Sequence, residues 1–103
     1  MIVHDLKILP EYFDLVKNGY KDFEIRKNDR NYKIGDAVRL REYDADKGEY
    51  TGNEIFSPIK YIFYGTGEYG VAEGYCIIGL MPSAPTSYTT KANSGYRILS
   101  EKR

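Results

Sequence analysis

Hydrophobic and polar residues alternate along the first segment of the chain, from His4 to Leu9. Leu6 and Ile8 fall on one side of an extended strand, because successive side chains of a strand point to opposite faces. Asp5 and Lys7 fall on the other side. This alternation predicts a β-strand with one buried face and one solvated face.

The pattern then changes to helical spacing. Pro10 suits the first position of a helix, and Glu11 supplies a favourable charge to its first turn. Asn18 and Gly19 form a helix stop. Between these signals, apolar residues recur at helical spacing and predict one buried stripe, made by Leu9, Phe13, Val16 and Tyr20.

A second alternating segment begins at Lys21 and carries an unusual set of charges. Phe23 and Ile25 point to one face of the predicted strand, and Glu24 and Arg26 point to the other. A lysine, a carboxylate and a guanidinium are therefore delivered to one neighbourhood. Two interpretations stay open: a polar binding or catalytic cluster, or an ordinary ion-paired strand surface that faces solvent.

The remaining pattern predicts further short strands separated by polar turns. Pro58 interrupts one apolar segment, and a proline of this kind belongs at a sheet edge or a bulge. Strands are expected at residues 21–28, 37–43, 54–64 and 75–81, with a polar connection over 44–53 and a glycine-rich loop over 65–74. One early helix and several short strands favour a mostly β (α+β) fold, a small and mostly antiparallel barrel with helices at its openings.

Composition divides the chain into a domain and a tail. Residues 1–82 are expected to form one domain, and a chain of 103 residues is long enough for one modest core. Residues 83–103 begin with a segment of low hydrophobicity, and we expect them to lie outside the domain and away from the charged cluster. In the alternative, Tyr96, Ile98 and Leu99 return to the domain and complete its core.

Net charge is zero, but the charges are unevenly distributed. Residues 21–41 carry seven basic side chains against four acidic ones, whereas residues 42–75 carry seven acidic against two basic. A neutral chain of this kind can still present a face that attracts phosphate. The chain also has eleven tyrosines, and some of them are available to stack on a base.

The chain lacks the marks of a membrane protein or a secreted protein. No apolar run approaches the length of a membrane span, and residues 1–5 do not resemble a signal peptide. Cys76 is the single cysteine, which excludes an internal disulfide, and its apolar neighbours predict a small core residue. We therefore expect a cytoplasmic protein with no membrane partner.

Three motifs that suggest a cofactor or a metal fail in their context. Gly65–Gly70 matches a dinucleotide fingerprint but leads into a strand instead of a helix, so a flexible loop is expected. Residues 44–48 begin like a calcium loop, yet Glu49 and Ile55 occupy positions that need glycine and glutamate. His4 has no histidine or cysteine partner for zinc and is expected at the surface or at a strand end. No cofactor and no metal are expected.

The order of these elements and the motifs of the first half resemble the ASCH domain family of the PUA-like superfamily. The resemblance is carried by residues 6–13, by Gly19, Lys21, Glu24 and Arg26 in the pattern GxKxxExR, and by residues 27–30 and 32–36. Within that family the chain is similar to a subfamily of uncharacterised proteins from bacteria and their phages. The resemblance covers about residues 4–81 and implies a small PUA-like β-barrel with flanking helices.

The resemblance also implies a cleft in which the family is thought to hold RNA or a nucleotide. Its candidate ligand-binding residues here are Lys21, Glu24, Arg26 and Arg30. Arg26 offers a planar fork to a phosphate or a base edge, and Lys21 offers a point charge. Glu24 can accept from an exocyclic amine, or it can pair with Arg26 and hold it in place. The first prediction is therefore a nucleic-acid-binding module for RNA or a modified nucleotide.

Two alternatives stay open beside binding. Some ASCH members hydrolyse acylated cytidine nucleosides with a threonine three residues after the motif lysine, but that position is Glu24 here and no serine or threonine precedes Thr51. A hydrolase acting on a modified nucleoside or on RNA would need Glu24 to activate water, with Lys21 as the second candidate catalytic residue. The other alternative is a small protein-interaction module.

Overall fold

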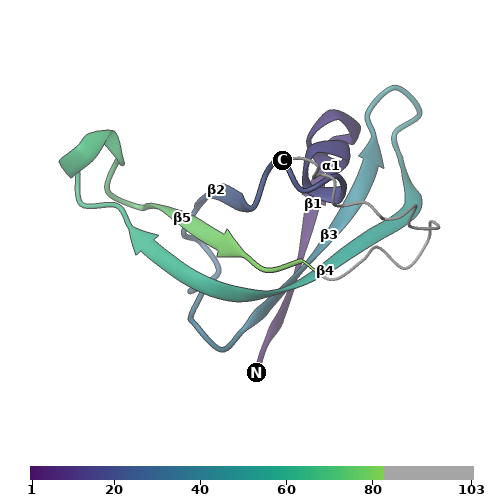
Figure 1. Cartoon of the computed structure of the whole chain (residues 1–103). Helices are drawn as coiled ribbons and strands as arrows, with labels where there is room; N and C mark the ends of the chain where they lie inside the picture. Colours follow the sequence, from purple (N-terminus) through teal and green to yellow (C-terminus); the bar gives the residue numbers. More distant parts are fainter. Residues whose placement is uncertain (83–103) are drawn as a thin grey trace.

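The computed structural model describes residues 1–82, and the predicted tail, residues 83–103, lies outside the described residues. The described part of the chain is mostly β with one α-helix, which confirms the predicted class (Figure 1). Its elements are β1 (Val3–Ile8), α1 (Pro10–Lys17), β2 (Phe23–Lys27), β3 (Ala37–Asp44), β4 (Glu49–Tyr64), the short 3-10 helix η1 (Glu68–Gly70) and β5 (Tyr75–Leu80). No helix in this part of the chain is long and apolar enough to cross a membrane.

The five strands form one sheet in the order β1-β3-β4-β5-β2. β1 runs parallel to β3, and the other neighbouring strands are antiparallel. β1 and β2 are therefore the two edges, and within residues 1–82 no backbone ladder joins them. The predicted closed barrel is not confirmed. The sheet is bent but open (Figure 1). The side chains of Arg26 and Arg30 bond the free edge of β1 where a backbone ladder would close a barrel.

β4 is a single long strand that belongs to two halves of the sheet. Its residues 49–58 pair with β3, and its residues 59–64 pair with β5. Pro58 lies at this change of partner, next to a register shift between Ile59 and Tyr61, so its missing N–H is tolerated at a bulge, as predicted. We call β1, β3 and the first part of β4 the first half of the sheet, and the rest of β4 with β5 and β2 the second half.

The connection between β3 and β4 is shorter than predicted. The sequence pattern predicts a polar connection over residues 44–53, but β4 already begins at Glu49. The Asp44 side chain accepts from two backbone N–H groups of the turn and tightens it. Tyr43 and Tyr50 then pack edge to face across the hairpin, with ring centroids 5.1 Å apart. The residues at the tip of this hairpin are polar because they face solvent, so their composition resembles that of a loop and did not predict the strand pairing.

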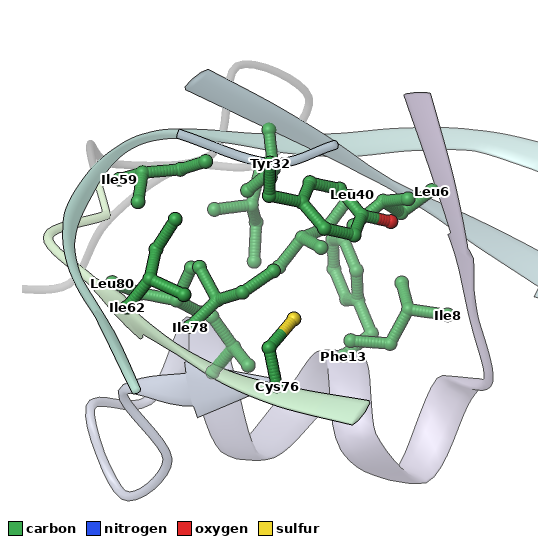
Figure 2. Packing of buried hydrophobic residues seen from close by; sticks show 13 residues of the cluster. Leu6, Ile8, Phe13, Tyr32, Leu40, Ile59, Ile62, Cys76, Ile78 and Leu80 are labelled. Atoms are coloured by element: carbon green, nitrogen blue, oxygen red, sulfur yellow. The ribbon is translucent and has the colours of Figure 1, made fainter. Parts of the chain in front are cut away.

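The hydrophobic core lies between the inner face of the sheet and α1 (Figure 2). From α1 it takes Phe13 and Val16, whereas Leu9 and Tyr20, predicted for the same stripe, are exposed. Leu9 only precedes the helix, and Tyr20 lies beyond its end at Lys17. The full cluster comprises Leu6, Ile8, Phe13, Val16, Tyr32, Val38, Leu40, Ile55, Ile59, Ile62, Cys76, Ile78 and Leu80.

His4 lies near the start of β1, in line with the predicted strand end, but it is buried, which corrects the alternative of a surface position. Its Nε2 lies 3.0 Å from Asp36 Oδ2, and its ring meets the ring of Tyr32 edge to face. Asp36 also accepts from the Ile2 N–H, and these bonds, the His4 bond first, hold the pKa of its carboxyl below the usual value. A histidine can be buried here because a partner 32 residues away satisfies it.

The Gly65–Gly70 segment is a loop between β4 and β5, as predicted, and it does not open an α-helix. Gly65 packs so closely against the backbone that a Cβ atom there would lie 2.0 Å from Ala72 O. Close approach of two backbones therefore accounts for this glycine. In β5, Cys76 is the small core residue that the sequence predicts, and burial raises the pKa of its thiol.

Candidate functional site

Two arginines occupy the open edge of β1. Arg30 Nη1 donates to the carbonyl of Asp5 at 2.6 Å, and Arg26 Nη2 donates to the carbonyl of Lys7 at 2.7 Å. Carbonyls two residues apart in a strand point to the same side, and here that side is the edge opposite β3. The guanidinium groups therefore satisfy backbone acceptors that a closing strand would otherwise take.

Arg26 is itself held by a carboxylate that is almost fully buried. Glu24 is 5% exposed, and its Oε1 accepts from Arg26 Nε at 3.1 Å. The other oxygen, Oε2, accepts from Lys21 Nζ at 2.5 Å, and this ammonium also donates to the carbonyl of Phe23. The predicted pairing of Arg26 with Glu24 is confirmed. We call Lys21, Glu24 and Arg26 the charged cluster.

The side chains of β2 alternate as predicted, but the charged face is the one that is turned inward. Phe23 and Ile25 are 41% and 61% exposed, whereas Glu24 is buried and Arg26 is only partly exposed. The interpretation of this segment as an ordinary solvated strand surface is therefore wrong for Glu24. The reason is topological: β2 is an edge strand, and its charged face lies opposite the unpaired carbonyls of β1, where polar partners are favoured.

A cleft of about 420 Å³ lies beside the charged cluster, between the end of β1, the start of α1 and β2. Its lining residues are Lys7, Ile8, Leu9, Tyr12, Lys21, Phe23, Glu24, Ile25 and Arg26. Two aromatic rings flank Lys21, whose Nζ lies 5.1 Å from the centre of the Phe23 ring and 5.9 Å from that of Tyr12. The volume is in the range of small-molecule sites, which combine apolar walls with a few polar groups.

The charged cluster retains hydrogen-bond donors that a ligand can use. A lysine ammonium has three donors, and Lys21 uses two of them to bond the carbonyl of Phe23 and the carboxylate of Glu24. An arginine has donors on three nitrogens, and within residues 1–82 Arg26 bonds through Nε and Nη2 but not through Nη1. These remaining donors suit a phosphate oxygen or a base carbonyl. Glu24 accepts from both cations and so positions them.

One predicted site residue, Arg30, lies outside the cleft, and one residue that was not predicted, Tyr12, lies in it. Arg30, a predicted ligand-binding residue, bonds to the β1 edge and does not line the cleft. Tyr12 lines the cleft together with residues 7–9, and none of these was a predicted site residue. One sign of this role for Tyr12 was present in the sequence: it is an aromatic residue outside the apolar stripe of the helix, and the structure shows it exposed. Only the position of α1 relative to β2 brings Tyr12 beside Lys21.

The cleft contains few of the groups that usually perform catalysis. No serine, threonine, cysteine or histidine lines it. No group of three or more histidine, cysteine or acidic side chains within residues 1–82 is arranged to hold a metal ion. Lys21 and Glu24, the candidate catalytic residues, are engaged with each other.

The chain is similar to a protein of a bacteriophage. The "Uncharacterized 12.9 kDa protein in GpA 3'region" of Escherichia phage P2 is 43% identical to it over 53 residues. The similarity covers 52% of this chain and spans about half, 47%, of the phage protein. Residues 3–80 match the family described as "Domain of unknown function (DUF3850)". This match runs from β1 to β5 and takes in the whole charged cluster, and the chain therefore belongs to the DUF3850 family.

Proposed function

We propose that the protein is a nucleic-acid-binding module that holds RNA or a modified nucleotide in the cleft between β1, α1 and β2. The observation that carries this proposal is the buried Glu24, which fixes Lys21 and Arg26 beside the cleft and leaves donors on both. Buried ion pairs are seldom more stable than well-packed apolar residues of the same volume. Satisfying the carbonyls of β1 accounts for Arg26, but it does not require the donors that Lys21 and Arg26 retain beside the cleft, whereas binding of an anionic ligand uses them.

The chemistry of a nucleotide matches the groups in the cleft. The third donor of Lys21 and the Nη1 group of Arg26 suit phosphate oxygens or the acceptor edge of a base. The ring of Tyr12 offers a surface on which a base can stack. Glu24 contributes by holding both cations, so a ligand meets them already positioned.

The proposal includes a relationship to the ASCH domains of the PUA-like superfamily. Gly19, Lys21, Glu24 and Arg26 match the GxKxxExR pattern of that family, and the resemblance implies a cleft for RNA or a nucleotide lined by this motif. The same lysine, glutamate and arginine line the cleft described above. The family description and the name of the phage relative specify no ligand, so the support comes from the motif and the geometry.

Fluorescence anisotropy with a labelled single-stranded RNA, and competition with free nucleotides, test this function. Lys21→Met should weaken binding about tenfold or more, because a charge-assisted hydrogen bond is lost. Lys17→Met, in α1 and outside the cleft lining, is the control and should bind as the wild type does. Affinity should fall steeply as salt rises. No binding of RNA or nucleotide at low salt would refute the proposal.

The same preparations separate binding from hydrolysis. Incubation with an acylated cytidine or with RNA should leave the substrate intact, because Glu24 already accepts from two cations and no hydroxyl or thiol nucleophile of the serine, threonine or cysteine type lines the cleft. Product release that disappears in Glu24→Gln would instead assign the cleft to a hydrolase.

A further inference from the structure

The outer face of the second half of the sheet is apolar and open to solvent. Strand register places six side-chain positions on it: Phe23 and Ile25 of β2, Ile77 and Gly79 of β5, and Tyr61 and Phe63 of β4. We call these six positions the aromatic face. Tyr61 is 59% exposed, and Phe23 and Ile25 are exposed as well. The core lies on the opposite side of these strands, and the one contact between aromatic rings that this face makes within the described residues joins Phe63 to Tyr69, with centroids 6.1 Å apart.

Gly79 lies between two rings of the aromatic face. Phe23 and Tyr61 are its cross-strand neighbours on either side. A Cβ atom added at Gly79 would make only ordinary contacts of 3.5 to 3.6 Å with Tyr61, and the residue does not have a positive φ. Neither packing nor the backbone therefore demands glycine, although glycine weakens the interior of a strand.

A glycine inside a strand marks a bulge, or the close approach of a ligand or of another backbone. Gly79 pairs with Tyr61 beside the register shift of β4, and it leaves the outward side of β5 without a side chain there. Strands are spaced about 4.8 Å apart, so Phe23 and Tyr61 are separated by roughly 10 Å at the backbone, with no side chain between them. This leaves a slot in which a flat ring can lie against aromatic side chains. The missing side chain at Gly79 and the exposure of Phe23 and Tyr61 both suit a ligand with a flat ring.

The charged residues that border the aromatic face along its strands are lysines. Lys60 precedes Tyr61 at the register shift of β4, and Lys27 is the next outward position of β2 after Ile25. Both lysines are exposed. None of the outward ladder positions of β2, β5 and the second-half part of β4 is acidic. A partner with planar rings and negative charge complements such a face.

We propose that the aromatic face stacks the bases of a single-stranded nucleic acid, with one base in the slot over Gly79 and phosphates near Lys27 and Lys60. Aromatic side chains on a sheet with cations beside them are a general means of holding single strands. This inference rests on the proposed function in taking a nucleic acid as the partner. The aromatic face adjoins the cleft at Phe23 and Ile25, which also line the cleft, whereas Tyr61 and Gly79 lie outside the cleft lining.

A second copy of this chain fits the aromatic face less well. In a two-fold contact the same patch meets itself. Lys27 and Lys60 would then meet no acidic residue from the outward ladder positions of the partner copy. Phosphate groups supply the missing negative charge, which is why we assign the face to a nucleic acid.

Anisotropy titrations of the full chain with labelled oligouridylate and oligodeoxythymidylate test the stacking. Tyr61→Ala should weaken binding about 5- to 100-fold, the range for loss of one base–aromatic stack. Tyr50→Ala is the matched control, since Tyr50 is 42% exposed on β4 but belongs to the first half of the sheet. Gly79→Val should weaken binding by filling the slot, with an unchanged or higher melting temperature because valine favours strands. Gly79→Ala should have a smaller effect in the same direction.

The salt dependence of the affinity distinguishes the contribution of the aromatic rings from that of the lysines. Lys60→Met should reduce the slope of log affinity against log salt by about 0.7, the value for one phosphate contact on a single strand. Tyr61→Ala should leave that slope unchanged, because stacking releases no counterions. Lys47→Met, an exposed lysine in the turn between β3 and β4, is the control.

The outcomes distinguish this inference from the proposed function. Loss of binding in Lys21→Met with normal binding in Tyr61→Ala and Gly79→Val would overturn the aromatic face as a nucleic-acid surface and leave the cleft intact. The reverse result would support the face and refute the cleft. A wild-type dimer that Tyr61→Ala dissociates, without any change in affinity for either oligonucleotide, would assign the face to a second copy and overturn the inference.

Discussion

The two halves of the sheet carry different side chains on their outer faces, although each half buries one acidic side chain of a strand, Glu42 of β3 and Glu24 of β2. In the first half, charged side chains cover the outer face and pair there, Arg39 with Asp5 at 3.0 Å and Arg41 with Glu54 at 3.4 Å. In the second half, the outer face is aromatic and the acidic side chain of β2, Glu24, is buried. Both halves share β4, so one continuous strand passes from the first arrangement to the second.

The two halves also differ in how exposed their ion pairs are, and this affects what each pair contributes to stability. Exposed ion pairs such as those of Arg39 and Arg41 contribute about 0–1 kcal/mol and mainly keep a surface solvated. Glu24 belongs to another class, because a buried carboxylate is tolerated only with partners and seldom improves on an apolar residue. The second half therefore retains a buried ion-paired cluster, and the proposed binding cleft lies beside it.

Matched substitutions of Glu24 and Glu54 should show the largest difference between the halves. Glu24→Gln removes the counter-charge of Lys21 and Arg26, both partly buried, and should lower the free energy of unfolding by about 2–4 kcal/mol. Glu54→Gln removes exposed pairs and should cost less than about 1 kcal/mol. Urea unfolding of both variants measures the contrast. Equal losses would show that the two halves hold their charges alike.

A smaller contrast is expected from Arg26→Lys and Arg41→Lys. A lysine at position 26 keeps the charge but cannot bond Glu24 and the carbonyl of Lys7 in the same planar geometry, so the free energy of unfolding should fall by about 1–2 kcal/mol. Arg41→Lys should change it by no more than about 0.5 kcal/mol. Thermal and urea unfolding both report these values. An unchanged stability in Arg26→Lys would mean that the open edge of β1 does not need the guanidinium.

Acid sensitivity should reside in the first half, at Asp36. Its pKa is lowered in the folded protein, chiefly by the bond with His4, so the unfolded chain binds this proton more tightly. The stabilisation is therefore complete above the ordinary aspartate value of about 3.9 and is lost as pH falls below it. Urea midpoints measured from about pH 6 to about pH 2.5 should depend less on pH in Asp36→Asn than in the wild type. Asp46→Asn, in an exposed turn, is the control and should keep the wild-type dependence.

Deletion of residues 83–103 should have the smallest effect. Both halves of the sheet and the buried cluster are formed within residues 1–82. The melting temperature should therefore change by no more than about 2 °C. A large decrease would show that Tyr96, Ile98 and Leu99 complete the core, and that the domain boundary predicted at residue 82 is wrong.

Local pattern was sufficient for most elements and for one contact of the site. Pro10 and the Asn18–Gly19 stop bracket α1, and in the last predicted strand the alternate positions Cys76, Ile78 and Leu80 are buried. The pairing of Glu24 with Arg26 also followed from the sequence, because residues two apart in a strand share a face and lie close together. In each case the relevant partners are near one another along the chain.

Only the tertiary structure decided which face of β2 is turned inward. Alternation states that Phe23 and Glu24 point to opposite sides, but it does not state which side is buried. That depends on the unpaired carbonyls of β1, which become neighbours of β2 only because β1 and β2 form the two edges of a bent sheet. The burial of His4 against Asp36 and the attachment of Arg30 to Asp5 have the same origin. The order of strands in space sets these contacts, and no local period encodes that order.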